Sequence, residues 1–237
     1  MLKVLVSALA CAALLPALAS AEPASPQGAA AIIAKQQERV QADVVSALLC
    51  TVPLHSPEKT PDGIGAYQYY TSGNGQATCA FYWSPQTGAH NLYLGHLTKF
   101  MNKGFEIGFG YPDNDMSLTP INPSSYYTSF VKLFSNGAKD MSTWHAEYLN
   151  PFEGGVYTIK NPIWTAYAQA GFEQAKGYPL GESSTSGTFG GICQGCPRQP
   201  ASPWTHATQT FAQYDANGNV LAYHCACHLS NSTAVWR

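Results

Sequence analysis

The residues best suited to chemistry in this 237-residue chain are clustered cysteines and histidines near its C-terminus. A CxxC pair, Cys193 and Cys196, is followed by His224-Cys225-Ala226-Cys227-His228. Sulfur and imidazole groups in these numbers could ligate a tetrahedral zinc ion. In a strand, however, Cys225 and Cys227 would point to one face and the two histidines to the other. We therefore expect disulfides here, and no metal or other cofactor.

An oxidising compartment is indicated by the N-terminus. A positive start at Lys3, an apolar run from Val4 to Leu15 and the small residues Ala19-Ser20-Ala21 are typical of a secretory signal peptide. The run is too short to span a bilayer, and no later stretch reaches membrane length. The sequence predicts a signal peptide over residues 1–21 and a secreted protein, extracellular, periplasmic or held at the cell surface.

Outside that segment six cysteines remain, an even number that predicts three disulfides in an exported protein. Their clustering favours one bridge between Cys50 and Cys79. The CxxC pair would then be cross-linked to Cys225 and Cys227. The sequence does not show which cysteine of one pair bonds to which cysteine of the other.

The composition excludes several classes of protein. Only 11% of the residues are charged, and 12 basic residues stand against 14 acidic ones. This balance disfavours a nucleic-acid partner, which would require a basic face. Apolar residues make up 45% of the chain, and 21 glycines and 16 prolines indicate many short elements joined by turns.

Upstream of the turns we expect one amphipathic helix, from about Gln27 to Leu49. Its apolar face would carry residues spaced by seven and four positions: Ile33, Val40, Val44 and Leu48. Thr51-Val52-Pro53 would end it, because the residue before a proline avoids helical angles.

The central part of the chain repeats itself. Gly-Phe-Glu, three residues and Gly-Tyr-Pro occur from Gly104 to Pro112 and again from Gly171 to Pro179, at an offset of 67 residues. Each copy predicts a strand rich in aromatic residues, a turn, a short helix that ends at a glycine, and a Gly-Tyr-Pro turn.

One face of each short helix should pack inward. In the first copy this face carries Leu97, Phe100 and Met101. In the second copy the equivalent positions carry Trp164, Tyr167 and Ala168. Glycine at 104 and 171 suits a left-handed helix cap.

These copies resemble LGFP repeats, short modules found in tandem on exported proteins. The resemblance rests on Phe81-Tyr82-Trp83-Ser84-Pro85, the helix after Gly95, the Gly104–Pro112 segment and Pro179-Leu180-Gly181. It implies attachment to the cell envelope or to a glycan. The first signature reads Phe-Gly-Tyr-Pro, and a degenerate third copy would begin at Gln209.

Together these patterns predict a strand-rich α+β fold in one disulfide-stabilised domain. Its parts would be an N-terminal helical segment (22–60), an LGFP-like repeat region (61–192) and a Cys/His-rich C-terminal hairpin (193–237).

Catalytic signatures are scarce. The chain has no GxSxG, HExxH, P-loop or dinucleotide-binding pattern. His145-Ala146-Glu147 has the H-x-E spacing of zinc deaminases, but no matching PCxxC follows. Glu106 and Glu173 occupy equivalent repeat positions, which argues against a unique catalytic role for either. A secreted hydrolase acting on cell-wall polymers remains an alternative without support from any motif.

Binding of a cell-wall or extracellular glycan is the function that the composition favours. Aromatic rings can stack on the apolar faces of sugars while amides and hydroxyls bond to their edges. The rings chosen as candidates are Tyr111, Tyr178, Tyr82 and Trp83. Tyr111 and Tyr178, on glycine-flanked turns, are expected to be the most exposed. A secreted protein that binds a protein partner is a further alternative.

Overall fold

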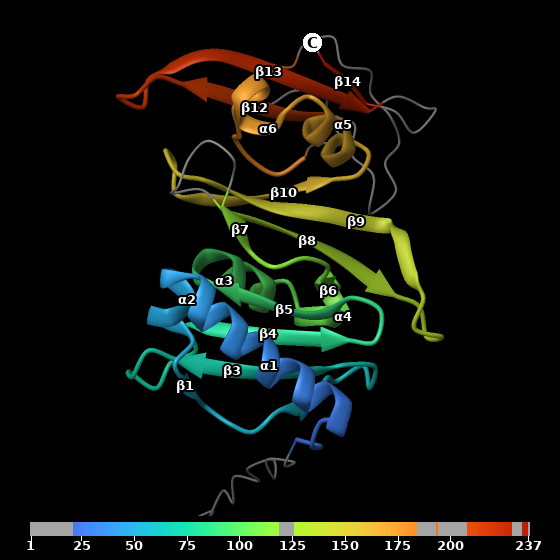
Figure 1. The fold of residues 1–237 in the computed structure, drawn as a ribbon. Coiled ribbons are helices and arrows are strands. Elements are labelled where there is room, and N and C mark those ends of the chain that lie inside the picture. Colours follow the sequence, from blue (N-terminus) through green and yellow to red (C-terminus); the bar gives the residue numbers. More distant parts are fainter. Residues whose placement is uncertain (1–20, 119–125, 184–192, 194–207, 229–233, 237) are drawn as a thin grey trace, which may run out of the picture.

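The computed structural model describes residues 21–118, 126–183, 193, 208–228 and 234–236. The expected signal peptide, apart from Ala21, and Cys196 lie outside these residues. Three antiparallel sheets lie one above another, with pairs of short helices between them (Figure 1). The strand-rich α+β fold is therefore confirmed. No helix in the described part of the chain is long and apolar enough to cross a membrane.

The first sheet has the order β1-β3-β4-β5, with β2 on the outer side of β3. Its strands are β1 (Val52–Pro53), β2 (Glu58–Lys59), β3 (Ala66–Thr71), β4 (Cys79–Ser84) and β5 (Gly88–Tyr93). One face is covered by α1 (Pro26–Ala42), and α2 (Val44–Leu49) follows. The expected Cys50–Cys79 disulfide ties the end of α2 to β4.

The prediction of a single N-terminal helix is wrong in two respects: the helix is interrupted, and different residues from those expected face the core. The chain breaks at Asp43, whose backbone is extended and whose carboxylate accepts a hydrogen bond from the N–H of Val45. This break rotates α2, so Val44 and Leu48 are 75% and 65% exposed. Ile32, rather than the neighbouring residue assigned to the apolar face, is the fully buried side chain of α1.

The second sheet has the order β10-β9-β8-β6, with β7 also on β8. Its strands are β6 (Tyr111–Pro112), β7 (Ser117–Leu118), β8 (Tyr126–Leu133), β9 (Lys139–Asn150) and β10 (Gly155–Lys160). Between the first and second sheets lie α3 (Leu94–Asn102) and α4 (Phe105–Phe109).

The third sheet has the order β11-β12-β13-β14. Its strands are β11 (Tyr178–Pro179), β12 (Thr208–Tyr214), β13 (Val220–His228) and β14 (Ala234–Trp236). Between the second and third sheets lie α5 (Ile163–Gln169) and α6 (Phe172–Lys176). Cys193 is bonded to Cys225, and Cys227 is disulfide-bonded as well, so the expectation that this cluster forms disulfides is confirmed for these three cysteines.

The internal repeat appears as two units, each a hairpin followed by two short helices. The first unit has the hairpin β4–β5 with α3 and α4, and the second has β9–β10 with α5 and α6. Gly104 and Gly171 separate the helices of each pair with φ of 86° and 92°, the left-handed conformation expected of them. On the preceding helices Phe100 and Tyr167 are fully buried, as predicted, whereas Met101 is 38% exposed.

The Gly-Tyr-Pro segments differ from the turns that were expected. Tyr111-Pro112 and Tyr178-Pro179 are short strands that each join the sheet of the next unit. The preceding glycine must lie against that sheet: a Cβ on Gly177 would come within 2.0 Å of the Ala212 carbonyl oxygen. The repeat therefore donates one strand from each unit to its neighbour.

Candidate functional site

The aromatic residues chosen from the sequence are buried. Tyr111 is 1% exposed and Tyr178 is 6% exposed, so the expectation that they are the most accessible rings is wrong. Tyr111 is covered by the loop before β3: its hydroxyl lies 2.9 Å from the Thr60 hydroxyl and donates to Asp62 at 2.7 Å. A Cβ on Gly65 would come within 2.6 Å of the Tyr111 ring, so this loop fits closely over it.

Tyr82 and Trp83 belong to the core of the first unit. Tyr82 stacks on Tyr67 with ring centroids 5.6 Å apart, and its hydroxyl lies 2.8 Å from that of Tyr69. Trp83 packs under α1, where a Cβ on Gly28 would come within 2.8 Å of its ring. These contacts indicate a structural role for both rings.

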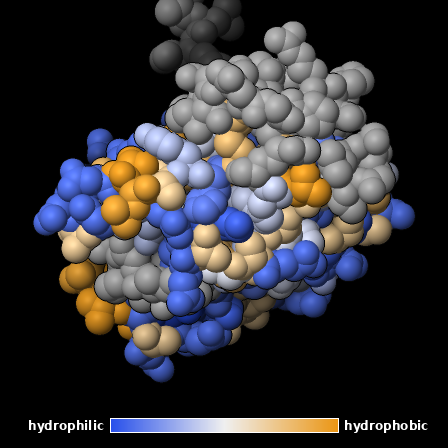
Figure 2. Space-filling view, turned by 90° about the horizontal axis from the view of Figure 1, so that it is seen from above, coloured by the Kyte–Doolittle hydropathy of each residue, from blue (hydrophilic) through white to orange (hydrophobic). Residues whose placement is uncertain are grey.

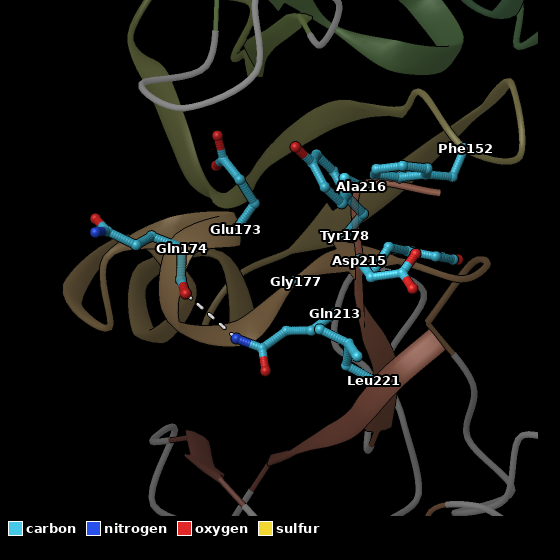
Figure 3. A pocket seen from close by; sticks show the side chains of 10 residues that line it. Phe152, Glu173, Gln174, Gly177, Tyr178, Gln213, Asp215, Ala216 and Leu221 are labelled. Atoms are coloured by element: carbon cyan, nitrogen blue, oxygen red, sulfur yellow. Dashed lines mark hydrogen bonds between the residues drawn. The ribbon is translucent and has the colours of Figure 1, made fainter. Parts of the chain in front are cut away.

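Tyr178 differs from the other three because it lines a cavity of about 690 Å³. This cavity lies where the β9–β10 turn, α6 and the β12–β13 hairpin meet (Figure 3). Leu221 and Ala216 contribute apolar side chains, but most of the lining is aromatic or polar, including Phe152, Tyr178, Tyr214, Glu173, Gln213 and Asp215. We call it the hairpin pocket.

Three rings form the aromatic wall of the hairpin pocket. Phe152 and Tyr214 are stacked, with centroids 4.4 Å apart and planes inclined by 17°. Tyr178 meets Phe152 edge to face at 5.5 Å. The Tyr214 hydroxyl accepts from Asn150 Nδ2 at 3.3 Å and donates to Glu153 at 3.2 Å, which fixes the ring in place. Phe152 is 40% exposed, so this wall is open to solvent at one end.

Polar groups lie around these rings. Gln213 donates to the Gln174 carbonyl oxygen at 3.2 Å (Figure 3). Its own amide oxygen accepts from His224 at 3.2 Å. Asp215 accepts from the backbone N–H of Asn219 at 2.8 Å and from its side chain at 2.9 Å. These hydrogen bonds lower the pKa of Asp215, which is therefore ionised at neutral pH.

The second carboxylate of the hairpin pocket is Glu173, from the first turn of α6. It is 5% exposed and accepts a hydrogen bond from the Tyr148 hydroxyl. Its repeat counterpart Glu106 is also buried, but neither carboxylate oxygen has a hydrogen-bond partner. Burial, together with the charge of Asp62, raises the pKa of Glu106 to about 6. Equivalent glutamates thus have different surroundings, and only Glu173 lines this pocket.

The H-x-E motif lies elsewhere, in a buried ion cluster between the first two units. Lys99 Nζ is 2.6 Å from a carboxylate oxygen of Glu147 and 2.6 Å from one of Glu182. Burial raises the pKa of Glu147 to about 7 and lowers that of His145 to about 4. No group of three or more potential metal ligands is found in the described part of the chain.

This ion cluster covers the edge of the second sheet. Lys99 donates to the Val156 carbonyl oxygen at 2.9 Å, and the Thr158 N–H donates to Glu182 at 3.1 Å. Gln209 donates to the Thr158 carbonyl oxygen at 3.1 Å. Since β10 is an edge strand, these side chains satisfy backbone groups that another strand could otherwise pair with. The cluster therefore has a structural explanation.

Sequence reasoning missed most of the hairpin pocket. The Asp215-Ala216-Asn217-Gly218 segment forms the turn that joins β12 to β13. Phe152 lies in the turn between β9 and β10, and its ring was not singled out. Turns that meet from different units leave no common pattern in the sequence.

A comparison with protein families identifies the first unit. The family model of the LGFP repeat matches residues 52–108, from β1 into α4. The chain therefore contains an LGFP repeat, as its motifs indicated. A comparison with curated proteins finds no match.

Proposed function

We propose that this protein is an exported, non-catalytic module that attaches to a cell-wall or extracellular glycan through the hairpin pocket. The observation that carries this proposal is the wall of Phe152, Tyr178 and Tyr214 beside the polar groups of Gln213 and Asp215. Sugars present apolar ring faces and hydroxyl edges, and this arrangement offers a partner for each.

The surface around the third sheet supports a localised site. Viewed from that end, the coloured residues show hydrophobic side chains in separate groups with hydrophilic ones between them (Figure 2). Among the coloured residues of this view, no broad apolar face of the kind that stable protein partners cover is seen.

At this pocket, the lowered pKa of Asp215 favours attachment over hydrolysis. Cleavage of a glycosidic bond requires a carboxylic acid that stays protonated and a second carboxylate across the bond. Hydrogen bonds lower the pKa of Asp215, which removes it as the acid. The raised pKa values of Glu106 and Glu147 belong to side chains that do not line the hairpin pocket.

Co-sedimentation with chitin, cellulose and peptidoglycan tests the proposal, with assay of the supernatant for released sugar. We expect retention of the mature protein on at least one polymer without release of soluble product. Phe152→Ala should weaken retention about fivefold, since stacking on an aromatic ring contributes roughly 1 kcal/mol.

Phe134→Ala is the matched control. Phe134 is a 51% exposed phenylalanine in the turn between β8 and β9, away from the pocket. Equal loss of retention in both variants would contradict the assignment of the pocket. Release of sugar by the wild-type protein would replace attachment by hydrolysis, and no retention on any polymer would reject glycan binding.

A further inference from the structure

The hairpin pocket has a charge pattern that the proposed function does not require. Two of its lining side chains, Glu173 and Asp215, are carboxylates, and none of the described lining residues is basic. Figure 3 shows Glu173 on the side of α6 and Asp215 on the opposite side, beside the aromatic wall. Glu173 is 5% exposed and is bonded to Tyr148, so Asp215 is the carboxylate that a ligand on the aromatic wall meets.

Neighbouring basic residues do not compensate this charge. Lys176, on α6, has its ammonium 4.7 Å from the centre of the Trp236 ring and does not line the pocket. His224, on β13, donates to Gln213, and burial together with the charge of Lys176 lowers its pKa. His224 is therefore neutral at pH 7, and the charge of the pocket lining is negative.

The aromatic wall adds to the same preference. The face of an aromatic ring carries a negative electrostatic potential that attracts ammonium groups. Phe152 and Tyr214 place two such rings beside the Asp215 carboxylate. An ammonium group also supplies three hydrogen-bond donors and no acceptor, which suits a pocket that presents carboxylate oxygens.

We infer that the hairpin pocket selects a sugar unit carrying a protonated amine, a 2-amino-2-deoxy sugar, over the same unit with an acetamide or a hydroxyl group. The inference rests on the proposed function and adds the chemistry of the ligand. The amine contacts the Asp215 carboxylate while the apolar face of the sugar ring lies on the aromatic wall.

Three β-1,4-linked oligosaccharides of equal length test the inference: those of glucosamine, N-acetylglucosamine and glucose. They share a backbone and differ in the group at C2. Titration calorimetry at pH 6, where the amine is protonated, should show the glucosamine oligomer binding about tenfold more tightly than the other two. This difference should shrink as salt is added, because the ligand is held partly by charge.

Asp215→Asn is the informative variant, since its amide oxygen can still accept the hydrogen bonds of the turn. It should abolish most of the preference for the amine. Asp140→Asn is the matched control: Asp140 accepts from the Ser142 N–H in a similar local turn away from the pocket, and its loss changes the net charge equally. Asp215→Ser provides a second variant if the first fails to fold, since a serine hydroxyl can also accept from the backbone N–H groups of the turn.

The outcomes separate this inference from the proposed function. Equal or tighter binding of the N-acetylated or neutral oligomer overturns the inference and leaves glycan attachment standing. Absence of binding to every oligomer and polymer rejects both. Binding of lysine amide as tightly as the glucosamine oligomer overturns the inference too, because the pocket would then recognise an amine without its sugar. An effect of Asp140→Asn equal to that of Asp215→Asn assigns the preference to overall charge and overturns it as well.

Discussion

The ring of Tyr167 stacks on that of Phe211, with 4.7 Å between their centroids. Phe100 bears the same relationship to Phe130, at 5.6 Å. Phe100 and Tyr167 are equivalent positions of the repeat, one on α3 and one on α5. Each unit therefore places one buried ring against the sheet of the next. One apolar cluster joins the first sheet to the second and another joins the second to the third, so neighbouring sheets share a core.

Removal of the second of these stacks should destabilise the whole protein. We expect Phe211→Ala to lower the free energy of unfolding by about 3–5 kcal/mol, because it deletes a fully buried ring. Denaturation in urea, followed by tryptophan fluorescence and by circular dichroism, measures the change. Phe134→Ala, at an exposed ring, should cost less than about 0.5 kcal/mol. Two separate transitions in the wild-type protein would contradict a shared core.

Glu147 should make stability depend on pH. Since burial raises its pKa from 4.5 to about 7, the folded protein holds a proton between these values that the unfolded chain has released. The free energy of unfolding therefore falls as pH rises through this range, by about 3 kcal/mol at most. Comparison with Glu147→Gln isolates this effect from that of His96 and His145, whose pKa values burial lowers to about 4 and which act in the opposite direction.

The stability difference between the wild-type protein and Glu147→Gln should thus decline from pH 4.5 to 7 and then level off. Denaturant titrations at half-unit pH steps measure it. A difference that stays constant over this range would show that Glu147 ionises as it does in the unfolded chain.

Replacement of Lys99 should cost more stability than replacement of an exposed lysine, because its ammonium lies within 2.6 Å of both Glu147 and Glu182. Lys99→Met leaves a buried carboxylate unpaired and should cost about 3 kcal/mol or more at pH 8. The cost should be smaller at pH 5, where Glu147 is protonated. Lys103→Met, at an exposed lysine after the same helix, is the control and should cost less than about 1 kcal/mol at either pH. Equal losses in the two variants would argue against the buried cluster.

The Cys50–Cys79 disulfide should stabilise the first unit. It closes a loop with a sequence separation of 29, which corresponds to about 3–4 kcal/mol of unfolded-state entropy. The double variant Cys50→Ala, Cys79→Ala should lose roughly this amount in urea denaturation. A loss below about 1 kcal/mol would mean that α1 and α2 remain packed on the first sheet without the link.

Local patterns in the sequence determined the repeat, the position of the first short helix in each copy and the left-handed glycines, whereas the second short helix of each copy was not predicted. Gly104 and Gly171 could be placed because a helix exit with positive φ depends on only a few neighbouring residues. Residue spacing also identified Phe100 and Tyr167 as inward-facing, since residues three and four positions apart share a helix face. The clustering of cysteines similarly favoured the Cys50–Cys79 bridge, which lies within one unit.

Burial of the tyrosines was decided only by the tertiary structure. Tyr111 and Tyr178 have the same flanking residues, yet a loop hydrogen-bonded through Asp62 covers the first, while the second lines the hairpin pocket. The break at Asp43 likewise reversed which apolar residues of the N-terminal segment face the core. Spacing determines which side chains share a face, but the neighbours that cover the face come from distant parts of the chain. Phe152 and Tyr214 meet for this reason: their turns belong to different units, and only the stacking of the sheets brings them together.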